Sequence, residues 1–143
     1  MPTPTLPAST KTTERYWPED ILTHPEPVEE TPADLLHAAA RDFNERSGEL
    51  LHARVEEGSW GEHLVFDFIL TSPALDGYTY RLFKLRHKLS PYPAEFIFDS
   101  RVLKVRTREE LELRLRAILS DPITRRAVSE LVRYGQERLA QAA

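Results

Sequence analysis

Residues 78–88 combine aromatic rings with positive charge at alternate positions. In a strand, alternate side chains share a face, so one face would carry Tyr78, Tyr80, Lys84, Arg86 and Lys88. Aromatic rings that stack on bases, beside cations that follow the phosphates, are typical of single-stranded nucleic-acid sites. A solvated outer sheet face rich in β-forming tyrosines has the same pattern. The formal net charge of −4 also differs from the basic charge usual for nucleic-acid domains.

Three histidines fall on segments with strand-like alternation, namely His52, His63 and His87. Asp67 follows His63 by four residues and therefore shares its strand face. Imidazole and carboxylate groups bind zinc and transfer protons, so a metal-dependent hydrolase at these four residues is one hypothesis. No spacing matches H-E-x-x-H or a related signature, and we expect neither a metal nor a cofactor.

Other motifs for catalysis are missing. The sequence has no G-x-S-x-G elbow, no P-loop and no dinucleotide-binding glycine motif. It has no cysteine, which excludes a thiol nucleophile and cysteine-ligated zinc. Asp67 interrupts an apolar run and has a structural explanation in cross-strand pairing with Arg54 or Arg81. We therefore expect a protein that is not an enzyme.

The N-terminal 30 residues predict an extended, acidic arm. Seven of the eleven prolines lie within residues 1–32, and proline excludes a regular helix or a central strand. The arm nevertheless contains large apolar side chains, each worth about 1.5–3 kcal/mol when buried. These side chains are Tyr16, Trp17, Ile21 and Leu22. They predict docking, either on the chain's own domain or on a partner or neighbouring subunit.

The loop at residues 90–93 sets Tyr92 between two prolines. A tyrosine presented rigidly in this way is suited to anchor an interface. A simple turn between two strands accounts for the same residues.

The net charge conceals two halves of opposite sign. Residues 1–80 contain 5 Lys and Arg against 15 Asp and Glu, whereas residues 81–143 contain 14 against 8. Either the halves neutralise each other within one fold or dimer, or a basic surface meets an acidic partner.

The elements that must position these residues follow from periodicity and caps. Thr31, Pro32 and Asp34 predict the start of a helix at residues 32–46. Alternation and turn residues predict strands at 50–57, 62–71, 78–87, 94–99 and 102–106. The T-x-x-E pattern at Thr107 and the pair Asp121-Pro122 predict two helices, the second reaching about Leu139.

Short turns between successive strands favour an antiparallel sheet. We therefore predict an α+β fold with four to five antiparallel strands, covered on one face by the N-terminal helix and the two C-terminal helices. The domain would occupy residues 31–143 as a single unit after the arm at residues 1–30. A length of 143 residues with 41% hydrophobic residues fits one small domain.

Together these features favour an adaptor, chaperone-like or immunity-type protein that binds an unidentified protein partner through the arm and a sheet or basic surface. A homodimer with exchanged arms is a natural variant. The nucleic-acid site and the hydrolase remain the alternatives. The sequence shows neither a secretory signal nor an apolar stretch near the roughly 20 residues of a membrane span, so we expect a cytoplasmic, bacterial-type protein without membrane contact.

Overall fold

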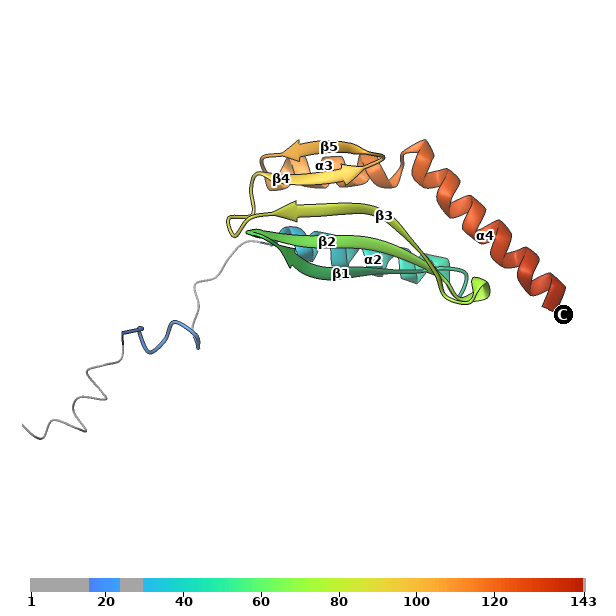
Figure 1. The fold of residues 1–143 in the computed structure, drawn as a ribbon, viewed down its shortest axis with the longest axis horizontal. Coiled ribbons are helices and arrows are strands. Elements are labelled where there is room, and N and C mark those ends of the chain that lie inside the picture. Colours follow the sequence, from blue (N-terminus) through green and yellow to red (C-terminus); the bar gives the residue numbers. More distant parts are fainter. Residues whose placement is uncertain (1–15, 24–29, 143) are drawn as a thin grey trace, which may run out of the picture.

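The computed structural model describes residues 16–23 and 30–142 of the chain (Figure 1). Its helices are α2 (Pro32–Ser47), α3 (Arg108–Leu119) and α4 (Pro122–Ala142), with a short 3-10 helix η1 (Pro73–Leu75). Its strands are β1 (His52–Trp60), β2 (His63–Ser72), β3 (Tyr78–His87), β4 (Ala94–Phe98) and β5 (Arg101–Val105). This order confirms the predicted α+β fold, one helix followed by five strands and two helices. Where the arm ends and the domain begins stays a prediction, because residues 1–15 and 24–29 lie outside the described ranges.

The five strands form one antiparallel meander in the order β1-β2-β3-β4-β5. The hairpin between β1 and β2 is tighter than predicted. Gly58, expected in the turn, pairs with Val65, and Trp60 pairs with His63. Gly61 then has a φ of +61°, which glycine adopts without steric cost.

The helices bury one face of the sheet. α2 packs chiefly against β1, and α3 packs against β5. The side chains enclosed between the two layers include Leu36, Leu51, Phe68, Leu70, Phe83, Leu85, Phe96 and Leu111. The cap predicted for the first helix is confirmed, because Thr31 N–H donates to the Asp34 carboxylate and Asp34 N–H donates to Thr31 Oγ1. These two bonds lower the pKa of Asp34.

A β-bulge in β3 corrects one expectation. Phe68 pairs with Phe83, but the next residue, Ile69, pairs with Arg81, so that Leu82 is an extra residue in β3. An inserted residue reverses the alternation of side chains along the rest of the strand. The tyrosines at 78 and 80 therefore do not share a face with the basic residues at 84 and 86, contrary to the ladder predicted from strict alternation.

The last helix crosses the end of the sheet and continues past it (Figure 1). α4 contacts η1 more than any strand. Gly135 lies at this contact, and a Cβ built there would lie 3.4 Å from Ala74 Cβ and 3.5 Å from Ser72 Oγ, which leaves room for a methyl group but not for a large side chain. None of the described helices is both long and apolar enough to cross a membrane.

Candidate functional site: a groove beside an unpaired strand edge

The first half of β3 has a strand on one side only. β4 pairs with residues 84–87 of β3 and extends no further. Within the described ranges, no other strand pairs with residues 78–83 on the side away from β2. A strand edge of this kind leaves the N–H and C=O groups of alternate residues free to pair with another chain. The bulge at Leu82 lies where pairing with β4 stops, which is a common place for a bulge.

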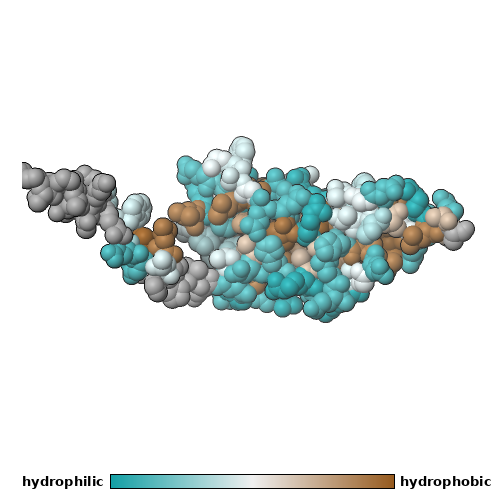
Figure 2. All heavy atoms as spheres, turned by 90° about the horizontal axis from the view of Figure 1, so that it is seen from below, coloured by the Kyte–Doolittle hydropathy of each residue, from teal (hydrophilic) through white to brown (hydrophobic). Residues whose placement is uncertain are grey.

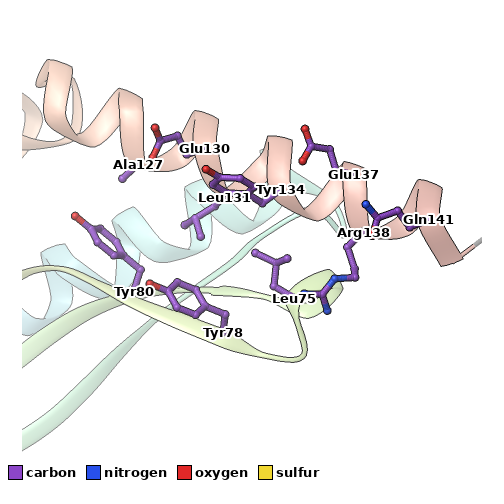
Figure 3. Close-up of a pocket in the computed structure, with 10 residues that line it drawn as sticks. All are labelled: Leu75, Tyr78, Tyr80, Ala127, Glu130, Leu131, Tyr134, Glu137, Arg138 and Gln141. Atoms are coloured by element: carbon purple, nitrogen blue, oxygen red, sulfur yellow. The ribbon is translucent and has the colours of Figure 1, made fainter.

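α4 runs along this open edge, and a groove of about 580 Å³ lies between the helix and the strand (Figure 3). Tyr78 and Tyr80 rise from β3 toward the helix, while Leu131 and Tyr134 project from α4. The groove is lined by Leu75, Tyr78, Tyr80, Ala127, Glu130, Leu131, Tyr134, Glu137, Arg138 and Gln141. Its size lies within the range of ligand-binding clefts.

The tyrosines give the groove aromatic walls with free polar ends. Tyr80 is half-buried against the core, whereas Tyr78 and Tyr134 are 53% and 47% exposed. Among the described residues, none of the three hydroxyl groups has a hydrogen-bond partner. Aromatic rings supply contact area, and a free hydroxyl can donate to or accept from a ligand.

Charges form the rim of the groove on the helix. The guanidinium of Arg138 pairs with the Asp76 carboxylate at 3.1 Å and links α4 to the residue after η1. Glu137 pairs with Arg133 at 3.5 Å, while the carboxylate of Glu130 has no ion-pair partner in the described structure. Because these groups are exposed, each pair contributes little stability.

The outer edge of β1 is capped by a side chain at one residue, Ala53. The Asn44 side chain in α2 donates from Nδ2 to Ala53 O at 2.9 Å and accepts from Ala53 N at 2.7 Å. Ser47 donates to Leu51 O at 2.7 Å just before the strand. A strand edge occupied by side-chain amides is protected against pairing with another chain. In the described structure no side chain caps residues 78–83 of β3 in this way.

The residues predicted to bind nucleic acid are divided between two faces. Tyr78 and Tyr80 face the groove, while Lys84 and Arg86 lie on the uncovered face of the sheet opposite Asp67 and Val65. Arg86 pairs with Glu95 at 2.8 Å. Lys88 is exposed beyond the end of β3. The structure therefore does not combine the expected stacking platform with the expected cations.

The four residues of the hydrolase hypothesis are not brought together as a group, although His63 and His87 line the same groove of about 280 Å³. His52 pairs with Thr71 and His63 with Trp60, at opposite ends of β1. His87 is buried, stacks on Phe66 with 5.5 Å between ring centroids, and lies with Nδ1 2.5 Å from Lys88 O. Among the described residues, no group of three or more His, Asp or Glu could hold a metal ion.

Asp67, the fourth member of that hypothesis, has the structural partner that its position predicted. Its Oδ1 lies 3.8 Å from Arg81 Nη1, close enough for an ion pair but too far for a hydrogen bond. Arg54, the other predicted partner, instead pairs with Glu56 at 2.7 Å.

The described part of the arm lies clear of the domain (Figure 1). Pro18 O accepts from Ile21 N at 3.3 Å and forms a turn. The side chains of Tyr16, Trp17 and Leu22 are 88%, 74% and 88% exposed. Figure 2 shows apolar atoms in this stretch, between the undescribed residues on either side. No described contact of the domain covers these apolar side chains.

Tyr92 occupies a different environment from the one expected of an exposed anchor. Its ring is half-buried and packs against the core of its own domain. A role for Tyr92 at an interface stays a prediction.

Sequence reasoning selected Tyr78 and Tyr80 but missed the rest of the groove. Leu131 belongs to the apolar stripe of the last helix, which predicts burial and not a binding site. Tyr134 had no signal of its own, because its position beside β3 depends on how α4 crosses the sheet. Family models, curated proteins and solved structures were all compared with the chain, and none of them matches it.

Proposed function

We propose that this protein is a non-enzymatic interaction module that binds an extended peptide segment of a partner protein between β3 and α4. The observation that supports this proposal is the unpaired edge at residues 78–83, which borders a groove lined by three tyrosines. Addition of a strand to a free sheet edge is a recurrent mode of peptide recognition, used for example by PDZ domains.

In this mode the peptide backbone pairs with the free N–H and C=O groups of β3. Alternate side chains of the peptide then point into the groove, where Tyr80 and Leu131 provide an apolar floor. Backbone pairing gives affinity for any extended segment, and the side-chain pockets give selectivity. In this proposal the sheet binds the peptide through the open edge of β3 and not through a basic face. An adaptor or chaperone-like role corresponds to such binding.

The experiment begins with selection of peptides from a random library on the full-length protein, followed by titration of a selected peptide. Amide hydrogen exchange then reports where it binds. We expect alternate amides of residues 78–83 to gain protection, because only alternate N–H groups face the open edge. Protection elsewhere, with β3 unchanged, contradicts the proposal.

Two matched variants test the groove itself. Tyr80→Ala removes a ring that lines the groove, and we expect it to weaken binding by about tenfold or more, as for an interface aromatic. Thr79→Ala changes the neighbouring residue on the opposite face and should leave the affinity unchanged. Equal effects of both variants would contradict a role for the groove.

The same samples test the nucleic-acid alternative. Single-stranded DNA and RNA are titrated at low salt, where phosphate contacts are strongest. Binding that disappears in the variant Lys84→Glu with Arg86→Glu, together with no library peptide bound, would replace the proposal by the alternative.

A further inference from the structure

A second surface, distinct from the groove, lies where β5 and α3 meet at the other edge of the sheet (Figure 1). We call it the β5–α3 surface and define it by Val102, Lys104, Arg106, Leu113 and Arg114. Val102 and Leu113 are 54% and 69% exposed. Val102 pairs with Ile97 on the uncovered face of the sheet and Leu113 lies on α3, so the surface extends around the outer edge of β5. Lys104, Leu113 and Arg114 line a shallow groove of about 260 Å³ together with Val105, Ala117 and one acidic residue, Glu110, whose carboxylate accepts from Arg106 N. β5 is the last strand of the sheet, so its outer edge carries no further strand in the described structure.

The cations of this surface lack local partners. In the described structure, no carboxylate pairs with the side chains of Lys104, Arg106 or Arg114. The neighbouring Arg108 and Arg116 differ, because Arg108 pairs with Glu30 and Glu112, and Arg116 pairs with Glu112. The β5–α3 surface thus combines exposed apolar side chains, unpaired positive charge and an open strand edge.

The arm segment, residues 16–23, has the complementary chemistry. It presents Trp17 and Leu22 beside the acidic residues Glu19 and Asp20. An acidic segment with exposed apolar side chains is suited to a basic surface with exposed apolar side chains, because both charge and apolar area are then matched.

The arm segment lies clear of the domain in the structure, but the chain tethers it within reach of this surface. Glu30 pairs with Arg108 in the first turn of α3, so the arm leaves the domain at the start of this helix, on a different flank of α3 from Leu113 and Arg114. Leu22 precedes Glu30 by eight residues, which span at most about 26–29 Å when extended. Six residues of helix separate Arg108 from Arg114, a rise of about 9 Å. The arm segment is therefore long enough to reach the surface on its own domain.

From this complementarity and reach, we infer that the β5–α3 surface is a docking site for the acidic arm segment of the same chain. Tethering gives the segment an effective concentration on the order of millimolar, so a weak intrinsic affinity is enough to keep it docked. Docking covers Val102 and Leu113 and shields the edge of β5. Any other acidic, apolar segment that binds this surface must compete with the arm.

Tryptophan fluorescence of the full-length chain tests the inference. The chain has two tryptophans, and Trp60 is 71% exposed, so Trp60→Phe leaves Trp17 as the single reporter with little effect on the fold. We expect acrylamide to quench Trp17 several-fold less in this protein than in a synthetic peptide of residues 14–23. Equal quenching in the protein and the peptide overturns the inference.

Charge reversal identifies the surface. In the Trp60→Phe background, Lys104→Glu with Arg114→Glu should raise quenching to the level of the peptide. The matched control, Lys88→Glu with Arg126→Glu, changes the net charge equally at exposed residues elsewhere and should not. If the two double variants change quenching equally, the inference is overturned, because the effect then comes from the overall charge of the protein and not from this surface. Leu113→Ala, which changes no charge, should also raise quenching.

Two further measurements make the assignment specific. The first adds Glu19→Lys and Asp20→Lys to the protein that carries Lys104→Glu and Arg114→Glu, so that both charges are reversed. If Trp17 is again protected from acrylamide, the arm and the surface pair directly; if it is not, direct pairing is contradicted. Protection that is independent of protein concentration supports docking on the same chain, whereas protection that increases with concentration assigns the site to a second copy and overturns the inference as stated. Tyr80→Ala should leave Trp17 protected, so failure of this site and failure of the peptide groove are distinguishable.

Discussion

Asn44 caps the edge of β1 at Ala53 with both ends of its amide, so a substitution here tests how much this contact stabilises the sheet. Its Nδ2 donates to Ala53 O and its Oδ1 accepts from Ala53 N. Asn44→Ala removes both bonds from partly buried groups, so we expect the free energy of unfolding to fall by about 1–3 kcal/mol. Urea denaturation should show a lower midpoint with an unchanged slope.

The control for Asn44 is an exposed polar residue outside the sheet. Gln136→Ala on α4 should change the unfolding free energy by no more than about 0.5 kcal/mol. If Asn44→Ala is as mild as Gln136→Ala, the amide does not protect the strand edge.

Asp34 gives a pH dependence whose sign follows from its contacts. The bonds with the backbone and then the side chain of Thr31 hold the pKa of Asp34 below its ordinary value of 3.8. A carboxylate with a lowered pKa stabilises the fold above the unfolded-state value, and this contribution is lost as the pH falls through the folded-state pKa. We expect Asp34→Asn to be less stable than the native protein at pH 7 and equally stable in strong acid. A difference that persists unchanged into strong acid, in melts at several pH values, would contradict this cause.

At the scale of the elements, the features that depend on local sequence pattern could be predicted from the sequence. Thr31, Thr107 and the pair Asp121-Pro122 predicted the three α-helices, and alternation predicted the five strands and their antiparallel order, whereas the 3-10 helix η1 was not predicted. The bulge at Leu82 was not predictable, because alternation in one strand contains no information about its register with the next. That single residue moved Tyr78 and Tyr80 to the helix-covered face.

The groove itself depends on packing that the sequence does not display. Two of its tyrosines were selected as functional, but for a nucleic acid and on the wrong face. α4 crosses η1 at Gly135, and in a helical pattern a glycine indicates only a weak position. The sequence does not show that Ala74 and Ser72 pack against Gly135, because that contact depends on the tertiary fold.

Two substitutions at Gly135 distinguish the effect of helix propensity from the effect of packing against η1. A Cβ at Gly135 would meet ordinary contact distances of 3.4 and 3.5 Å, so Gly135→Ala should fit and stabilise α4 by up to about 1 kcal/mol. This gain raises the melting temperature by about 3–5 °C in a domain of this size. Gly135→Leu has no room and should destabilise by about 1–3 kcal/mol. Circular dichroism melts that show the same effect for both variants would contradict the close packing of α4 on η1.

At the scale of the whole molecule, the opposite charges of the two halves of the chain are only partly paired. Glu30 reaches Arg108 and Asp76 reaches Arg138, and both pairs join the acidic half to the basic half. The cations of the β5–α3 surface remain without partners in the described structure. In the docking inferred above, the acidic arm segment supplies matching charge, which is why removal of the arm should have consequences beyond the arm itself.

Deletion of residues 1–29 tests whether the domain folds without the arm and whether the edge of β5 needs the arm as a cover. The shortened chain keeps Glu30 with its bond to Arg108 and keeps the cap at Thr31, so it should still unfold in one cooperative transition. It also loses the segment inferred to cover Val102, Leu113 and the edge of β5. An uncovered strand edge with exposed apolar side chains pairs with other copies. Sedimentation should therefore show association that increases with concentration, and Leu113→Glu should suppress it.

The other outcomes of this deletion are equally informative. Loss of the cooperative transition would make the arm part of the core. A shortened chain that stays monomeric at every concentration would mean that the β5 edge needs no cover. A full-length dimer that becomes monomeric on deletion would instead support exchange of arms between subunits, because the contacts that hold the dimer would then reside in the removed residues.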